Sequence, residues 1–97
     1  MAVLVMFRTE GDPKDLLQRY DATMARAAAQ APVRPEAHFC VPTATGMLIV
    51  DVWGSREDLR RGVTENPSFK AVWEEAGWPD ETVEIYDVHG RDWPSSD

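Results

Sequence analysis

Short apolar segments alternate along the chain with segments whose apolar residues recur at helical spacing. Residues 2–8 (AVLVMFR) are apolar and rich in β-branched side chains, which is typical of a buried strand. Asp12 is a favoured N-cap residue and Pro13 suits the first helical position, so a helix is expected to begin there. Its apolar stripe consists of Leu16, Leu17, Tyr20, Met24, Ala27 and Ala28. Two prolines within residues 31–35 end the helix.

Two more strands, at residues 36–41 and 47–53, flank a short loop. The loop ends in Gly46, which indicates an antiparallel hairpin. A second helix is expected to begin at Ser55, because Asp58 stands three residues later in a capping-box pattern.

The last third of the chain predicts one more helical segment and one more strand. Asn66 is expected to interrupt the second helix and to cap a further segment that ends at Gly77. The alternating residues 81–89 (ETVEIYDVH) predict the last strand. The order β-α-β-β-α-β is that of the ferredoxin-like α+β fold, a two-layer sandwich with helices on one face of a four-stranded antiparallel sheet. We expect one domain over residues 1–90 and a short tail over residues 91–97.

Strand periodicity predicts which side chains face the helices. A buried polar group without a partner costs about 1–3 kcal/mol, so the uniformly apolar set of each strand is assigned to the helical side. This set consists of Val3, Val5, Phe7, Ala37, Phe39, Val41, Leu48, Val50, Val52, Val83 and Ile85. The matching hairpin register pairs His38 with Asp51 and Cys40 with Ile49.

The opposite face of the sheet is expected to combine large apolar side chains with a few ionisable groups. The members of this face are Leu4, Met6, Arg8, His38, Met47, Ile49, Asp51, Trp53, Glu84 and Tyr86. An apolar face of this size is rarely left in water, so we expect a two-fold homodimer whose sheets pack face to face. The barrel cavity enclosed between the sheets would bind a small, apolar or aromatic molecule.

Three residues of this face are candidates for catalysis. Asp51 would fix the tautomer of the His38 imidazole and raise its basicity, as a general base requires. The alternative for His38 is a structural role, with a hydrogen bond across the hairpin. Arg8 either stabilises negative charge on a substrate or forms an ion pair with Glu84.

The expected ligand-binding residues are Met6, Ile49, Trp53, Glu84 and Tyr86. Trp53 and Tyr86 could stack on a flat aromatic molecule, or pack in the core or in the dimer interface. Cys40 has no adjacent basic group in the sequence and is expected to be an inert thiol. Two histidines without a cysteine cluster give no zinc signature, so no metal and no cofactor are expected. Haem bound through His38 or His89 is the alternative.

Composition narrows the range of partners. The chain has 97 residues and a net charge of −7, which argues against nucleic acid and against an anionic membrane surface as partners. No apolar run approaches the roughly 20 residues that are needed to cross a bilayer. The single cysteine, Cys40, cannot form an intrachain disulfide, so a reducing cytoplasm is the expected location.

Three stretches of the chain resemble the antibiotic-biosynthesis-monooxygenase-like branch of the dimeric α/β-barrel superfamily. They are residues 38–46 (HFCVPTATG), 47–55 (MLIVDVWGS) and 84–89 (EIYDVH). The resemblance implies a ferredoxin-like dimer, and a function among cofactor-independent oxygenases of aromatic polyketides, haem-degrading enzymes and uncharacterised proteins. Typical monooxygenases of this branch carry histidines at places that match Gly62 and Ser68 of this chain.

Two functions therefore stay open. The protein is either a dimer that binds a small apolar or aromatic molecule without performing chemistry, or a cofactor-independent monooxygenase-like enzyme. In the enzyme, His38 would act as the general base, Asp51 would orient it, and Arg8 would stabilise developing negative charge.

Overall fold

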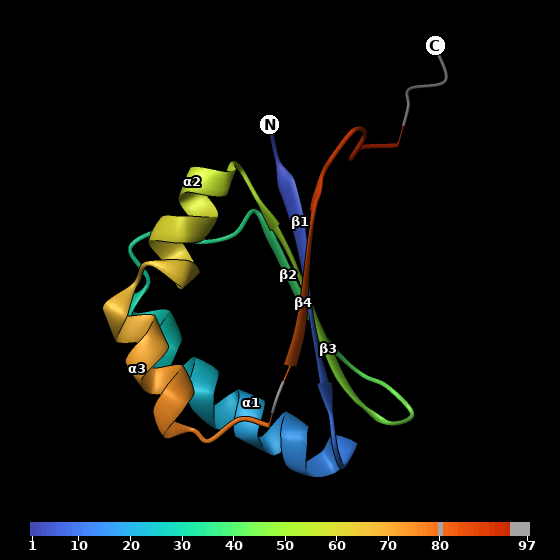
Figure 1. Ribbon diagram of the computed structural model, residues 1–97, viewed down its shortest axis with the longest axis vertical. Coiled ribbons are helices and arrows are strands. Elements are labelled where there is room, and N and C mark those ends of the chain that lie inside the picture. Colours follow the sequence, from blue (N-terminus) through green and yellow to red (C-terminus); the bar gives the residue numbers. More distant parts are fainter. Residues whose placement is uncertain (80, 94–97) are drawn as a thin grey trace.

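A computed structural model describes residues 1–79 and 81–93 of the chain (Figure 1). Its four strands are β1 (Val3–Glu10), β2 (Ala37–Pro42), β3 (Gly46–Trp53) and β4 (Glu81–Asp87). Its helical segments are α1 (Pro13–Ala27), the 3₁₀ turn η1 (Ala28–Gln30), α2 (Arg56–Leu59), the π-helical turn η2 (Arg60–Thr64) and α3 (Pro67–Glu75). The strands form one antiparallel sheet in the order β2-β3-β1-β4, and Figure 1 shows the helices on one side of it. The predicted ferredoxin-like α+β fold is confirmed.

The helices begin where the sequence places capping residues. The side chains of Asp12, Ser55 and Asn66 each accept a hydrogen bond from backbone N–H groups two or three residues further along the chain. These bonds satisfy N–H groups that have no partner within the helix. After α3, Gly77 adopts a positive φ of 67°, a conformation that favours glycine. Local signals therefore define the helix boundaries.

The second helix differs from the regular helix expected from Ser55. After α2 the backbone widens into η2, where the Glu65 N–H donates to the carbonyl oxygen of Arg60, five residues earlier, at 2.7 Å. Gly62 lies in this turn against the indole of Trp53. A Cβ atom at position 62 would stand 2.5 Å from the Trp53 ring, so only glycine lets the turn approach this closely.

The hairpin register is confirmed, but the predicted orientation of β2 and β3 is wrong. His38 pairs with Asp51 and Cys40 with Ile49, as expected. These side chains point toward the helices and not away from them, as the burial of their row on β3 shows: its members are Met47, Ile49, Asp51 and Trp53. The helix-facing rows contain Val3, Val5, Phe7, Thr9, His38, Cys40, Pro42, Met47, Ile49, Asp51, Trp53, Glu81, Val83, Ile85 and Asp87.

The other side of the sheet has no helix over it, and we call it the open face. Three rows span all four strands on this face, and they contain Ala37, Phe39, Val41, Leu48, Val50, Val52, Leu4, Met6, Arg8, Thr82, Glu84 and Tyr86. The orientation predicted for β1 is confirmed, since Val3 and Val5 are buried under the helices. Val83 and Ile85 also lie on the helical side, yet they are 48% and 39% exposed because the helices cover β4 incompletely.

The orientation of β2 and β3 was mispredicted because both faces of these strands are largely apolar. The cost of burying a polar group without a partner predicts that Asp51 lies away from the helices. Asp51 is 5% exposed, but His38 satisfies it, so that cost is largely offset.

The core lies between the sheet and the helices in two clusters. One is built from Val3, Val5, Trp53 and Leu59, and the other from Leu16, Met47 and Ile49. Among residues 1–79 and 81–93, no helix is long and apolar enough to cross a membrane. The cytoplasmic location stays a prediction.

Candidate functional site

A cavity of about 470 Å³ lies between the sheet and the helices of a single subunit. The sheet contributes Phe7, His38, Ile49, Asp51, Trp53 and Glu81 to its wall. This is not the cavity expected between the sheets of two subunits, which stays a prediction, and His38, Asp51 and Trp53 line this cavity instead of that one. The cavity is mostly apolar and contains a few polar groups, as small-molecule sites do.

The helical wall of the cavity has a small-residue part and an aromatic part. Ala27, Ala28 and Ala31 line it at the end of α1, and their short side chains leave space beneath the sheet. Phe69 and Trp73 line it from α3, where their rings stack with centroids 5.5 Å apart. A flat molecule could therefore lie against an aromatic surface on the α3 side.

His38 is the central polar group of the cavity wall. Its Nδ1 lies 2.5 Å from Oδ1 of Asp51, and its Nε2 is hydrogen-bonded to the Tyr20 hydroxyl of α1. The Asp51 carboxylate accepts a hydrogen bond from Nδ1–H of the neutral imidazole. Nε2 then carries no proton and accepts a hydrogen bond from the Tyr20 hydroxyl. The three side chains form one connected chain, which we call the Tyr20–His38–Asp51 trio.

The protonation of His38 and Tyr20 follows from their surroundings. The hydrogen bond to Asp51 is the largest influence on His38 and raises its pKa above 6.5, although burial opposes the shift. Burial is the largest cause of the raised pKa of Tyr20, and the nearby acidic groups Asp51 and Asp21 add to it. Tyr20 therefore stays neutral and His38 is the group that exchanges protons near neutral pH.

Glu81, at the start of β4, is a second polar group in the wall and was not singled out from the sequence. Its Oε2 atom is buried, and among the described residues it has no hydrogen-bond partner. Burial raises the pKa of the Glu81 carboxyl, while the Trp73 indole opposes the rise. The one signal for this position is strand pairing: Glu81 lies opposite Thr9 of β1, in a row of side chains that faces the helices.

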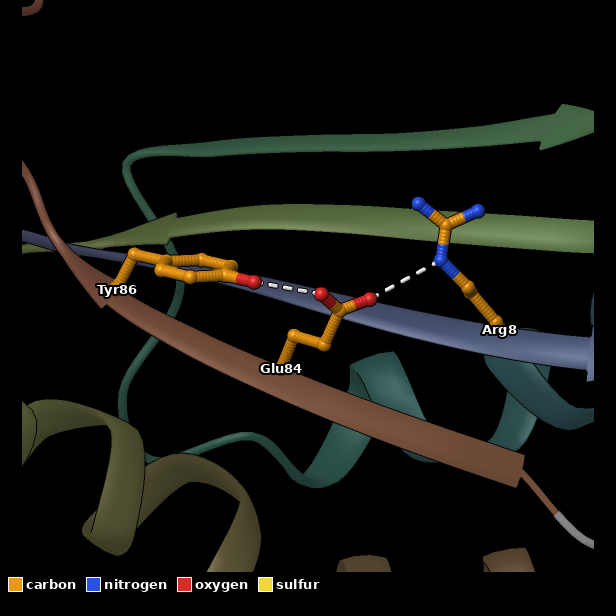
Figure 2. Close-up of polar contacts among 3 residues, drawn as sticks. All are labelled: Arg8, Glu84 and Tyr86. Atoms are coloured by element: carbon orange, nitrogen blue, oxygen red, sulfur yellow. Dashed lines mark hydrogen bonds and ion pairs between the residues drawn. The ribbon is translucent and has the colours of Figure 1, made fainter.

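The remaining predicted site residues lie elsewhere. Arg8, Glu84, Tyr86 and Met6 belong to the open face and share no cavity with His38. Figure 2 shows three of them joined through one carboxylate: Nε of Arg8 donates to Oε1 of Glu84 at 3.1 Å, and the Tyr86 hydroxyl donates to Oε2 at 2.6 Å. The expected pairing of Arg8 with Glu84 is present, but the eight predicted site residues are divided between the two faces of the sheet.

Solved structures match this fold, among them three proteins. They are SnoaB, a cofactor-independent oxygenase from Streptomyces nogalater (TM-score 0.65, 15% identity, 93% of each chain covered), Rv0793 from Mycobacterium tuberculosis (TM-score 0.69, 16% identity, 94% of this chain and 98% of that one), and a Chloroflexus aurantiacus protein named as an antibiotic biosynthesis monooxygenase (TM-score 0.62, 13% identity, 95% and 98%). The chain has the antibiotic-biosynthesis-monooxygenase-like fold. The predicted resemblance is confirmed at the level of the fold.

No family model and no curated protein matches the sequence. On this antibiotic-biosynthesis-monooxygenase-like fold, Gly62 lies in the turn η2 and Ser68 lies in the first turn of α3. Gly62 has no room for a histidine, because Trp53 occupies the space that any side chain would need. The histidine that lines the cavity is His38, on β2.

The described residues do not fit a metal or a haem ligand. Within residues 1–79 and 81–93 no group of three or more His, Cys, Asp or Glu side chains gathers around one point. An axial haem ligand needs a free imidazole nitrogen, and both ring nitrogens of His38 have partners. His89 is exposed and does not line the cavity. Burial raises the pKa of the Cys40 thiol, so it stays protonated near neutral pH.

Proposed function

We propose that the protein is a homodimer that binds a small, flat, apolar or aromatic molecule in the cavity of each subunit. The observation that carries the proposal is the cavity of about 470 Å³ with His38 and Asp51 in its apolar wall. Small-molecule sites commonly measure about 300–1,000 Å³ and combine apolar walls with a few placed polar groups. The rings of Trp53 and Trp73 offer contact area, and His38 offers a polar anchor.

Filling the cavity tests this binding. Ala31→Phe adds a ring inside the cavity, whereas Ala25→Phe adds the same ring on the exposed side of α1. Isothermal titration with a panel of fused-ring phenols should show binding to the wild type and to Ala25→Phe. Binding to Ala31→Phe should weaken about tenfold or more, through loss of space. A panel that binds none of the proteins, or all three equally, would contradict the proposal.

The dimer is supported by the open face. Its exposed apolar side chains include Phe39 at 60% and Val41 at 41%. In the three rows across the sheet Arg8 and Glu84 are the only charged residues, and they neutralise each other. Although the chain has a net charge of −7, two copies of this face do not repel each other. Sedimentation velocity over a dilution series should show a dimer; a monomer at every concentration would contradict this part of the proposal.

A second candidate function is the cofactor-independent monooxygenase-like enzyme. The observation that favours it is the His38–Asp51 pair in the cavity wall, on a fold that SnoaB shares. His38 would remove a proton from an acidic CH₂ group of the bound molecule, and the resulting anion would itself reduce O₂. One oxygen atom would form the new carbonyl, and the other would leave as water with the two hydrogens of that carbon.

The Tyr20 hydroxyl constrains this chemistry, because it occupies Nε2 of His38. It must turn away, or it must pass the substrate proton on to His38. Oxygen uptake with the ligands found by calorimetry should rise as the pH rises through the raised pKa of His38, and His38→Gln should abolish it. Uptake that persists in His38→Gln would exclude His38 as the base and leave the binding proposal standing.

A further inference from the structure

The Arg8–Glu84–Tyr86 trio is a fixed arrangement on the open face. Both carboxylate oxygens of Glu84 accept hydrogen bonds, one from Arg8 and one from Tyr86. The Tyr86 hydroxyl and then Arg8 lower the pKa of Glu84, so the carboxylate stays charged near neutral pH. The position of the guanidinium group is therefore defined by its own subunit.

This arrangement uses only part of the guanidinium group. Arg8 donates through Nε, and among the described residues its two terminal nitrogens have no hydrogen-bond partner. Figure 2 shows them pointing away from Glu84 and toward β3. The residue paired with Arg8 on β3 is Leu48, so the free N–H groups face an apolar part of the sheet.

Covering the open face would change the state of these N–H groups. In the proposed homodimer they would be removed from water, and a buried charge without acceptors is strongly unfavourable. A two-fold interface presents the same surface from the other side. In the three rows across the sheet the side-chain acceptors of that surface are Thr82, Glu84 and Tyr86, and all of them lie on β4.

We propose that Arg8 of each subunit donates across the two-fold axis to the partner's Glu84 and Tyr86. The inference rests on the proposed dimer and names the contact that sets how its two sheets align. Because the free nitrogens point toward β3, the partner's β4 then lies over β3, and the strand order of the two sheets runs in opposite directions. The two trios together form one neutral polar cluster in an otherwise apolar interface.

Charge-reversal variants of Arg8 and Glu84, mixed with each other, distinguish an Arg–Glu contact across the two-fold axis from the Arg–Glu contact within one subunit. Arg8→Glu places two carboxylates together, and Glu84→Arg places two guanidinium groups together, so each variant alone should dimerise about 100-fold more weakly. In a mixture, a heterodimer restores Arg–Glu pairing only across the axis. Within each subunit the like charges remain.

The measurement is sedimentation velocity and native mass spectrometry of each variant and of the equimolar mixture, with circular dichroism to verify folding. The mixture should form heterodimers within about tenfold of the wild-type dissociation constant. Arg56→Glu and Asp87→Arg are matched controls, because they reverse an exposed ion pair of 3.1 Å on the helical side, and they should dimerise like the wild type.

Two results would overturn the inference while the dimer stands. One is a dimeric wild type whose mixed variants stay monomeric, and the other is dimerisation of the single variants at wild-type strength. A wild type that is monomeric throughout would instead overturn the proposed dimer, and the inference with it.

Discussion

Each face of the sheet has a hydrogen-bonded trio of a carboxylate, a basic side chain and a tyrosine, but the order of the three groups differs, and on the helical side the tyrosine comes from α1. On the helical side the histidine is in the middle, between Asp51 and Tyr20. The Asp51 side chain is 7% exposed and that of His38 is 29% exposed. A basic group that gains and loses its proton near neutral pH is thus held in an apolar wall, which suits proton transfer or ligand recognition.

On the open face the carboxylate of Glu84 is in the middle, and the basic group is an arginine that stays charged. The side chains of Arg8 and Glu84 are 49% and 34% exposed. An exposed pair of this kind adds little to the stability of one subunit. This difference supports the proposed roles: the Tyr20–His38–Asp51 trio would take part in ligand binding or proton transfer, and the Arg8–Glu84–Tyr86 trio would contact a second subunit.

The largest expected effect tests the orientation of the two faces. Ile49→Lys would bury a charge in the core and should cost more than about 4 kcal/mol, which is enough to unfold many domains of this size. Val50→Lys, one residue further, should leave the fold intact and prevent dimerisation. Circular dichroism and sedimentation velocity measure the two outcomes. The reverse pattern would mean that β3 faces the other way.

The covered trio should be sensitive to loss of its central residue. His38→Leu leaves both Asp51 and the Tyr20 hydroxyl without a partner, and such orphaned groups cost about 1–3 kcal/mol. Urea unfolding of the wild type and the variant measures the change. An unchanged free energy of unfolding would show that water replaces the imidazole at no cost.

The contact between Gly62 and Trp53 should tolerate no added methyl group. Gly62→Ala places a Cβ atom 2.5 Å from a ring that is 2% exposed, so the turn or the indole must shift at a cost of about 1–3 kcal/mol. Thermal unfolding measures this loss, and Gly90→Ala, with open space around its Cβ, is the matched control. Equal midpoints for the two variants would contradict the close contact.

The His38–Asp51 pair should make stability depend on pH. The folded pKa of His38 is raised above the unfolded value of about 6.5, so the contribution is fully present below about pH 6.5 and is lost as the pH rises through the folded pKa. The temperature of the unfolding midpoint should decrease as the pH is raised from about 6.5 through the folded pKa of His38, and the decrease should be less steep in Asp51→Asn. If the unfolding midpoint changes with pH equally steeply in the wild type and in Asp51→Asn, Asp51 is not the cause of the pH dependence.

The smallest expected change in the free energy of unfolding comes from removing one tyrosine hydroxyl, at Tyr20 or at Tyr86. Tyr20→Phe removes a hydrogen bond to a half-buried imidazole and should cost about 1 kcal/mol. Tyr86→Phe removes a bond on the open face and should leave the free energy of unfolding of the monomeric Val50→Lys background unchanged. Denaturant titration of both pairs measures the difference, and equal losses would erase the distinction between the faces.

Much of the fold could be predicted because its signals are local. Caps at Asp12, Ser55 and Asn66 define where helices begin, and the glycine-terminated loop defines the hairpin register. The hairpin register alone predicts that His38 lies opposite Asp51. The local pattern could not decide which face of the hairpin the helices cover, because the open-face residues Leu48, Val50 and Val52 are as apolar as the residues of β3 that are buried.

The rest of the site depends on contacts between distant segments. Helical spacing places Tyr20 in an apolar stripe, but a tyrosine buried in that stripe needs a polar partner on the sheet, and the partner is His38. The need of Tyr20 for a polar partner is the feature of the sequence that predicts His38 beneath the helices. Glu81 and the space beside Ala31 follow only from how α1, α3 and β4 come together.

The wide turn η2 makes the length of this segment as important as its composition. The hydrogen bond from Glu65 to Arg60 closes a loop one residue longer than that of an ordinary helical turn. The additional residue lets Gly62 rest on Trp53 while Val63 and Thr64 reach the cavity. Deleting a single residue between Arg60 and Thr64 would tighten the winding and rotate these side chains away from the cavity, so a change in chain length here would alter the shape of the cavity more than most substitutions.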